Sequence, residues 1–358
     1  MADKESDFML KAFELAQKGA GLVSPNPMVG AVLVKEGRIV GEGYHLYDGL
    51  KHAETYAIEM AGEQARGATL YCNLEPCCHY GRTSPCTDAL IEAGIARAVI
   101  ATRDSDPRVS GRGIAQMEAA GITVEVGMYE RKALRINECY FKYVTQRLPF
   151  VHGAVIYKGN DEGSSDEWNP SPEFLNLASE YDALVLGCEA GPNLALMEAC
   201  LSRKRHRPPV IAGTPRALRS IKDFSQDLEE KNASVLIITD RTEGDLTENR
   251  IAVFGSLKEI EPVKPDLDSI LRALARFRVT SCTVLANSRE HEILGDLTKL
   301  DKLTIILPGS NHEEAIRSLG EGEDLVIGLD EVEYNHTGRH TEMVGYPREC
   351  DMDTMDTF

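Results

Sequence analysis

The sequence predicts an α/β protein of two domains. Its 358 residues correspond to two domains of ordinary size, since most domains have about 100–200 residues. Short apolar segments of strand length alternate with segments whose apolar residues recur at helical spacing, a pattern typical of layered α/β domains. Charge divides the chain as well. Residues 1–147 carry 17 basic and 19 acidic residues, a net charge of −2, whereas residues 148–358 carry 22 and 38, a net charge of −16.

The first half alternates helix and strand signals. Ser6 is placed to cap a helix that continues to Gly19, and apolar segments at 29–34 and 38–40 flank a short turn that contains Gly37. The remaining elements expected in this half are a helix over 52–61, a strand over 68–72, a helix over 87–93, a strand over 97–102, a helix over 114–120, a strand over 122–126 and a helix over 130–145.

The second half begins after a linker at 147–149 and contains strands that are continuously apolar. Such strands indicate a sheet covered on both faces. We expect a polar loop over 158–169 and, from 334 to 358, a disordered tail, so that the domains are 1–147 and 148–333. The strands are expected at 150–157, 183–186, 210–212, 234–238, 282–286 and 303–307, with the clearest helix at 266–277.

Composition excludes several classes of partner. No run of about 18 apolar residues exists, so no membrane-spanning helix is expected. The net charge of −18 makes nucleic acid an unexpected partner, because binding phosphate backbones depends on clustered Lys and Arg. The charged N-terminus resembles neither a secretory signal nor a transit peptide, although one could already have been removed.

The strongest chemical signal is His52-Ala53-Glu54 followed by Cys77 and Cys86. Four of the nine cysteines lie within residues 72–86, which favours a metal site in a reducing compartment over a disulfide framework. One imidazole and two thiolates are three ligands of the kind that zinc prefers, and they leave the fourth tetrahedral position for water. Three protein ligands therefore predict a catalytic site, because a structural site would have a fourth.

Glu54 is expected to act as the proton shuttle of this site. It follows His52 by two residues at the start of a helix, where it can reach a water on the metal without being a ligand. A His-x-Glu motif followed by Pro-Cys is the pattern of the zinc deaminases. Here eight residues, rather than two, separate Cys77 from Cys86, and this longer loop contains His79 and Arg82, which could hold a phosphate.

Four segments together closely resemble the riboflavin-pathway pyrimidine deaminases, and the resemblance covers about residues 6–150. It implies a cytidine-deaminase-like α/β/α fold and one zinc ion per chain. It also implies the substrate 2,5-diamino-6-ribosylamino-4(3H)-pyrimidinone 5′-phosphate, whose 2-amino group leaves as ammonia. The segments are Ser24-Pro25-Asn26-Pro27-Met28-Val29-Gly30, His52-Ala53-Glu54, Leu74-Glu75-Pro76-Cys77 with the loop to Cys86, and Asp106 to Gly113.

The same resemblance suggests how the substrate is bound. Asn26 would orient the pyrimidine, and His45, His79 and Arg82 would lie near the ribosyl phosphate. Tyr56 stands where the family commonly has Asn, and Cys78 where it commonly has Ser. Neither of these two residues is an expected zinc ligand.

In this family the deaminase is often fused to a reductase of dihydrofolate-reductase-like fold, and the second half has the right length and position for one. Its motifs are degenerate. Val151-His-Gly-Ala-Val-Ile-Tyr-Lys-Gly159 lacks the Asp that usually ends the first strand, Leu285-Ala-Asn-Ser-Arg-Glu290 replaces a Glu-Gly-Gly turn, and Gly187-Cys-Glu-Ala-Gly-Pro192 replaces a Gly-Thr-Val segment. The pattern is similar to plant-type monofunctional deaminases. We therefore expect an inactive reductase-like domain that does not use NADPH.

Three alternatives remain open. The chain could be a bifunctional deaminase and NADPH-dependent 5-amino-6-(5-phosphoribosylamino)uracil reductase, a nucleic-acid base deaminase, or a non-catalytic scaffold subunit. We expect a homo-oligomer that binds a small phosphorylated pyrimidine, with no membrane and no nucleic acid as partner. The expected location is the cytoplasm for a bacterial protein and the plastid for a plant-like one whose transit peptide has been removed.

Overall fold

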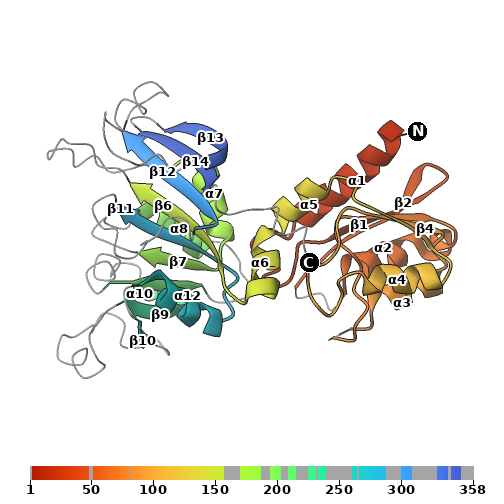
Figure 1. Ribbon diagram of the computed structural model, residues 1–358, viewed down its shortest axis with the longest axis horizontal. Helices are drawn as coiled ribbons and strands as arrows, with labels where there is room; N and C mark the ends of the chain where they lie inside the picture. Colours follow the sequence, from red (N-terminus) through yellow and green to blue (C-terminus); the bar gives the residue numbers. More distant parts are fainter. Residues whose placement is uncertain are drawn as a thin grey trace. The chain divides into compact units, whose positions relative to one another are not determined.

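The chain forms two compact units, Met1–Arg147 and Leu148–Phe358, in a computed structural model (Figure 1). The division falls at the boundary expected from the sequence. The structure describes residues 2–47, 51–81, 83–156, 170–186, 194–202, 209–214, 225–230, 233–238, 260–263, 266–287, 300–308, 329–337 and 340–347.

The first unit is built on a sheet with the strand order β2-β1-β3-β4-β5. β1 pairs antiparallel with β2 and β3, whereas β3, β4 and β5 are parallel. The carboxyl ends of the three parallel strands therefore lie at one edge, which is where α/β proteins commonly place their sites. The strands are β1 (Gly30–Lys35), β2 (Arg38–Tyr44), β3 (Thr69–Cys72), β4 (Arg97–Ile100) and β5 (Thr123–Val126).

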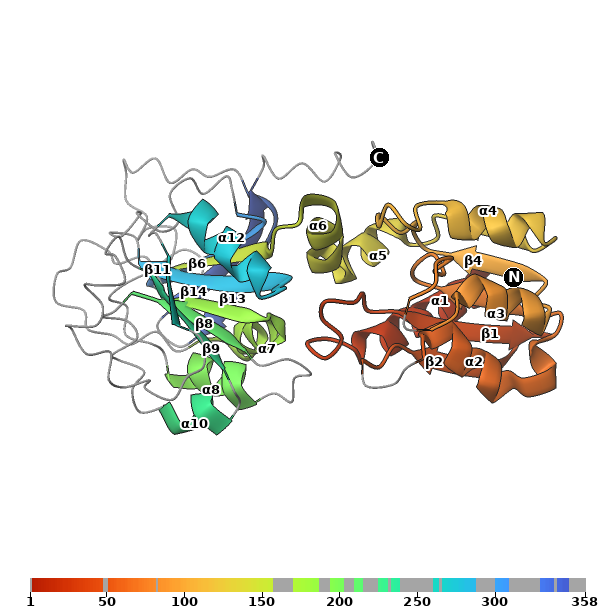
Figure 2. The ribbon, with the colours of Figure 1, turned by 90° about the horizontal axis from the view of Figure 1, so that it is seen from below.

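Helices cover both faces of this sheet and give the predicted α/β/α layers (Figures 1 and 2). The apolar side chains of α2, α3 and α4 share one cluster with the sheet, and those of α1 and α5 share another on the opposite face. The first helix begins at Ala2 rather than after Ser6. The helices are α1 (Ala2–Gln17), α2 (Ala53–Ala61), the short 3₁₀ helix η1 (Gly62–Ala65), α3 (Cys86–Ala93), α4 (Arg112–Ala119), α5 (Glu130–Ile136) and α6 (Glu138–Gln146).

The single helix predicted over 130–145 is wrong in one respect, because α5 and α6 meet at a break. Asn137 stands at the break with φ −115° and ψ 16°, which lies outside the helical range. Its side chain bonds the backbone of Met28, 109 residues earlier in the chain. Hydrophobic periodicity could not reveal the break, because the spacing of apolar residues continues through it.

Two glycines on β2 allow α2 to lie very close to the sheet. A Cβ atom at Gly41 would lie 2.1 Å from the carbonyl oxygen of Ala57, and one at Gly43 would lie 2.1 Å from the carbonyl oxygen of Ala53. Both obstacles are backbone atoms, so no side chain could move aside to make room. The absence of a Cβ atom at these positions therefore sets how closely the first turn of α2 approaches the strand.

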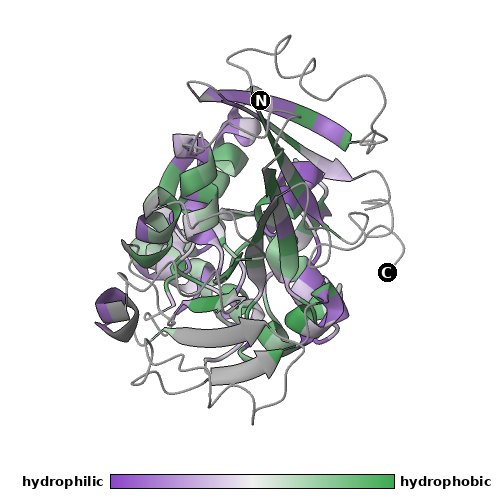
Figure 3. Ribbon diagram, turned by 90° about the vertical axis from the view of Figure 1, so that its left-hand side faces the viewer, coloured by the Kyte–Doolittle hydropathy of each residue, from purple (hydrophilic) through white to green (hydrophobic). Residues whose placement is uncertain are grey.

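The second unit contains, within its described residues, a sheet with the order β10-β9-β8-β7-β11-β6-β12-β14-β13. The pairs are parallel except at one edge, where β14 is antiparallel to β12 and β13. In Figure 3 the apolar residues are concentrated on the strands in the middle of this unit. The strands are β6 (Phe150–Ile156), β7 (Ala183–Leu186), β8 (Val210–Gly213), β9 (Ser234–Ile238), β10 (Ile260–Val263), β11 (Ser281–Asn287), β12 (Lys302–Pro308), β13 (Leu329–Thr337) and β14 (His340–Pro347).

Helices cover both faces of this second sheet, as its continuously apolar strands predicted. α12 (Leu267–Arg276) packs on one face, and α7 (Pro172–Glu180) and α8 (Leu194–Ser202) pack on the other (Figure 2). A short helix, α10 (Ser225–Glu230), lies between β8 and β9 in sequence. None of the helices in the described ranges is long and apolar enough to cross a bilayer. The loop expected over 158–169 lies outside those ranges.

The disordered tail predicted from residue 334 is wrong as far as residue 347. Residues in this segment form the end of β13 and all of β14, and β14 pairs with β12 from Leu303 to Pro308. Within this segment, polar residues such as Asn335 and His336 lie on β13, an edge strand whose side chains are mostly exposed. Such polar, exposed residues are also typical of a disordered tail. Residues 348–358 of the predicted tail lie outside the described part of the chain.

We expect Gly43→Ala to lower the free energy of unfolding by about 1–3 kcal/mol, the usual cost of overpacking, because backbone atoms of α2 would have to move. Gly37→Ala is the control. Gly37 has open space around it but a φ of 70°, so only the left-handed backbone conformation disfavours alanine there. This substitution should lower the free energy of unfolding by about 1 kcal/mol. Urea unfolding of both variants measures the difference. Equal losses would contradict the close packing of α2 as the cause.

Candidate active site

Three separate segments bring the predicted metal ligands together. His52 directly precedes α2, Cys77 lies in the loop after β3, and Cys86 is the first residue of α3. The Nδ1 atom of His52 lies 3.1 Å from Sγ of Cys86 and 3.4 Å from Sγ of Cys77. All three potential ligand atoms lie within 4.8 Å of one another. No other cluster of this kind is found in the described ranges.

These donors fit a zinc ion. Zinc–nitrogen and zinc–sulfur bonds of about 2.1 and 2.3 Å at tetrahedral angles separate a nitrogen from a sulfur ligand by about 3.6 Å. The two nitrogen–sulfur distances are 3.1 and 3.4 Å, close to that value. A hydrogen bond from the Cys86 thiol, supported by one from His52, lowers the pKa of Cys77 to about 4. The backbone N–H of Cys86, at the start of α3, also donates to Sγ of Cys77 at 3.4 Å, so this sulfur is held as the thiolate that a metal needs.

Glu54 lies beside this cluster without joining it. Its side chain is 3% exposed and contacts the Cys86 thiol, and burial raises the pKa of its carboxyl. The Oε2 atom is buried and has no hydrogen-bond partner among the described residues. A buried carboxyl with an unused oxygen next to a metal site can accept a proton from one group and donate it to another.

Two of the four expected substrate residues lie against the metal cluster. The Nδ2 atom of Asn26 lies 3.1 Å from Nε2 of His45. The ring of His45 packs edge-on against the ring of His52, with centroids 5.3 Å apart and an interplanar angle of 84°. The structure therefore joins Asn26 to His45, 19 residues later in the chain, and through the His45 ring to His52.

The other two expected substrate residues belong to the loop between Cys77 and Cys86. The Nδ1 atom of His79 is buried and has no hydrogen-bond partner in the described part of the chain. Hydrogen bonds with Arg108 lower the pKa of the Asp106 carboxyl despite its partial burial. His79 is close enough to Asp106 to contribute to this lowering. Arg82 lies outside the described residues.

Glu75 is a residue of the site that the sequence analysis did not single out for a role. Its carboxylate is 3% exposed and accepts four backbone N–H groups, from Asp104, Gly111, Gly113 and Ile114, at 2.9–3.2 Å. It thereby joins the loop before Cys77 to the first turn of α4. Glu75 follows the end of β3 by three residues, and its amide partners are visible only in the fold.

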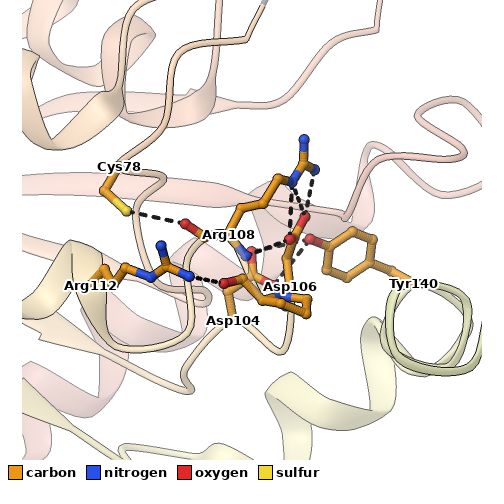
Figure 4. A network of polar contacts seen from close by, with 7 residues as sticks. Cys78, Asp104, Asp106, Arg108, Arg112 and Tyr140 are labelled. Atoms are coloured by element: carbon orange, nitrogen blue, oxygen red, sulfur yellow. Dashed lines mark hydrogen bonds and ion pairs between the residues drawn. The ribbon is translucent and has the colours of Figure 1, made fainter.

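A second group of polar residues surrounds Cys78 and involves the loop after β4 (Figure 4). The Sγ atom of Cys78 donates to the carbonyl oxygen of Arg108 at 3.6 Å, so it faces this loop. The Tyr140 hydroxyl, from α6, donates to both carboxyl oxygens of Asp104 at 3.1 Å, and Arg108 pairs with Asp106 at 2.5 Å. Burial raises the pKa of Asp104 to about 7.

Comparisons with known proteins agree with this geometry. Residues 2–102 match the family of the cytidine and deoxycytidylate deaminase zinc-binding region. The riboflavin biosynthesis protein RibD of Aquifex aeolicus (strain VF5) is 52% identical over 147 residues, which cover 41% of this chain and 41% of that protein. The chloroplastic riboflavin biosynthesis protein PYRD of Zea mays is 35% identical over 298 residues, 80% of this chain and 71% of the maize protein.

A solved structure extends the similarity to both units. It is a diaminohydroxyphosphoribosylaminopyrimidine deaminase/5-amino-6-(5-phosphoribosylamino)uracil reductase from Thermotoga maritima, with 30% identity and a TM-score of 0.73. The match covers 96% of this chain and 99% of that one. The chain therefore belongs to the RibD/PYRD family of riboflavin biosynthesis proteins, with a zinc deaminase domain of cytidine-deaminase-like fold followed by a domain of dihydrofolate-reductase-like fold.

Proposed function

We propose that this protein removes the 2-amino group of 2,5-diamino-6-ribosylamino-4(3H)-pyrimidinone 5′-phosphate by zinc-dependent hydrolysis. The observation that carries the proposal is the convergence of His52, Cys77 and Cys86 within 4.8 Å, with the buried carboxyl of Glu54 beside them. Membership of the riboflavin biosynthesis family supports the pyrimidine phosphate as substrate. Asn26, His45, His79 and Arg82 are the residues proposed to bind it.

The residues of the site divide the chemistry between them. His52, Cys77 and Cys86 would hold the zinc ion, which when bound lowers the pKa of a water to about 7 and so supplies the nucleophile. Glu54 would accept the proton released from that water and pass it to the ring nitrogen. It would then carry the hydroxyl proton of the tetrahedral adduct to the amine, which leaves as ammonia while the C–N bond breaks and the carbonyl forms. Asn26 would orient the pyrimidine so that the carbon bearing the 2-amino group faces Glu54, and His45, His79 and Arg82 would lie near the ribosyl phosphate.

We propose further that the second unit has no NADPH-dependent reductase activity. The stretch from Val151 to Gly159 lacks the Asp that usually ends the first strand of the reductase. The net charge of −16 over residues 148–358 does not favour binding a dinucleotide phosphate. The segments 187–192 and 288–290, where the reductase motifs are expected, lie outside the described residues.

The second candidate function is the bifunctional deaminase and reductase. It is favoured by the Thermotoga maritima structure, whose name includes both activities and which matches nearly the whole chain. We propose a homo-oligomer for the assembly. A plastid location is proposed if the source is a plant, because the maize relative is chloroplastic, and a cytoplasmic one if it is bacterial.

Incubation of the purified protein with the diaminopyrimidine phosphate, with and without NADPH, tests both proposals. We expect one ammonia released per substrate consumed, the same deaminated product in both reactions, and no loss of NADPH absorbance. Mass spectrometry identifies the product. Consumption of NADPH together with a reduced product would establish the bifunctional enzyme instead, and an unchanged substrate would refute the deaminase.

Glu54→Gln is expected to retain one zinc ion per chain but to lower kcat by at least about 10²-fold, because the amide cannot transfer the proton. Glu59→Gln on the same helix is the control, since Glu59 is half exposed and pairs with Lys51. Steady-state ammonia release measures activity, and atomic absorption measures zinc. Activity near that of the wild type in Glu54→Gln would remove Glu54 from the mechanism.

His52→Ala is expected to lose zinc, because two thiolates alone are a poor substitute for three ligands. His336→Ala provides a histidine control from the exposed edge strand β13, and it should keep one zinc ion per chain. Metal content after dialysis against a weak chelator measures the difference. A full complement of zinc in His52→Ala would show that the metal is bound elsewhere.

A further inference from the structure

We propose that Asn137 is a positioning residue for deamination, acting through the peptide of Met28 on the substrate residue Asn26. This inference rests on the proposed deaminase function and adds to it a residue well beyond residues 2–102, which match the zinc-binding region. Asn137 does not contact the metal cluster. It lies at the break between α5 and α6, and its side chain is 3% exposed.

Both polar atoms of the Asn137 side chain bond the same residue. Its Oδ1 atom accepts from the N–H of Met28 at 2.8 Å, and its Nδ2 atom donates to the carbonyl oxygen of Met28 at 3.0 Å. A side-chain amide can accept from a backbone N–H through its oxygen and donate to a backbone carbonyl through its nitrogen at the same time, whereas an ionised carboxylate has no proton to donate. The identity of the residue at 137 is therefore matched to the backbone of Met28.

The Met28 backbone lies in the segment that carries Asn26. Asn73, at the end of β3, holds the same segment from the other side, donating to the Met28 carbonyl at 2.9 Å and accepting from Gly30 N–H at 2.8 Å. The backbone N–H of His45 donates to the carbonyl oxygen of Val29 at 2.9 Å. Backbone groups that are bonded to buried side chains hold a loop, and the side chains on it, more narrowly than backbone groups that bond to water.

The consequence is a fixed relation between Asn26 and the metal cluster. With Met28 held, the Nδ2 atom of Asn26 lies 3.1 Å from His45, whose ring packs against the zinc ligand His52. Loss of the Asn137 side chain would leave the N–H of Met28 without its partner and release one of two donors on its carbonyl. A displacement of about 1 Å in a substrate-positioning group can lower the rate about 10²-fold.

The backbone at Asn137 supports a role beyond helix formation. An unbroken helix over 130–146 would satisfy more backbone hydrogen bonds, and Asn is among the less favourable residues in a helix interior. The chain instead leaves helical geometry at this residue, and the side chain reaches Met28. Tyr140, one turn further along α6, contacts Asp104 in the loop beside Cys78. This helix pair thus contacts two segments of the deaminase site.

A double-mutant cycle tests the inference with wild type, Asn137→Ala, Asn26→Ala and the double variant. We expect Asn137→Ala to lower kcat/KM per bound zinc by at least about tenfold, while the zinc content stays at one per chain. In the Asn26→Ala background the same change should lower kcat/KM less than about twofold, because the group that it positions is already gone. A merely structural residue would give the same factor in both backgrounds.

Thr145→Val is the matched control, because it removes a hydrogen bond of 2.8 Å to the Phe141 carbonyl on the same helix without contact to the Met28 segment. It should leave kcat/KM unchanged. Asn137→Asp, of nearly the same size, replaces Asn137→Ala if the latter does not fold. It keeps the acceptor for Met28 N–H but replaces the donor with an oxygen that faces the Met28 carbonyl, so it should also lower kcat/KM, and this loss should likewise disappear in the Asn26→Ala background.

The outcomes separate this inference from the proposed function. If the wild type does not deaminate the pyrimidine phosphate, the proposed function fails. If the wild type is active and Asn137→Ala is as active, or loses zinc in proportion to activity, or acts equally in both Asn26 backgrounds, then the positioning role is overturned and the deaminase assignment stands. Non-additive loss at full zinc occupancy supports the role.

Discussion

The first unit depends on bringing one imidazole and two sulfur atoms from three segments to a common point. The tolerance is narrow, because ligand atoms of a shared zinc ion must lie within about 4 Å of one another. The histidine directly precedes α2, and this helix can approach the sheet closely only because β2 has Gly41 and Gly43 beneath it. The loop after β3 carries Cys77, and the first turn of α3 carries Cys86, whose backbone N–H contacts the Cys77 sulfur.

The loops around this point are held by buried polar side chains rather than by strands. Glu75 accepts four backbone N–H groups around the start of α4, and Asn73 and Asn137 hold the peptide of Met28 from two sides. Each of these side chains is nearly or fully buried, so each hydrogen bond that it makes also satisfies a backbone group that would otherwise be unpaired. Loops fixed in this manner restrict the positions that the side chains of Asn26, His45 and Cys77 can take.

The buried polar residues of the second unit are arranged differently. In the described ranges some of them join elements of the sheet and its helices: His152 bonds Thr304 at 2.7 Å, and Glu342 on β14 accepts from Ser171 N–H at 2.8 Å at the start of α7. Among those described residues, no group of histidine, cysteine and acidic side chains converges as His52, Cys77 and Cys86 do.

The sequence by itself determined the two-unit α/β architecture and indicated the candidate metal cluster of His52, Cys77 and Cys86, with Glu54 beside it. These depend on local signals, namely apolar periodicity and residues whose chemistry has few other uses at such spacing. Only the tertiary structure decided the rest. It showed the break at Asn137, the four amides around Glu75 and the contact of Asn26 with His45. It also showed strands within residues 334–347, a segment whose composition is similar to that of a disordered tail. The physical reason is that each of these depends on a partner distant in the chain, and a hydrogen bond between residues 28 and 137 leaves no mark on the local pattern of either.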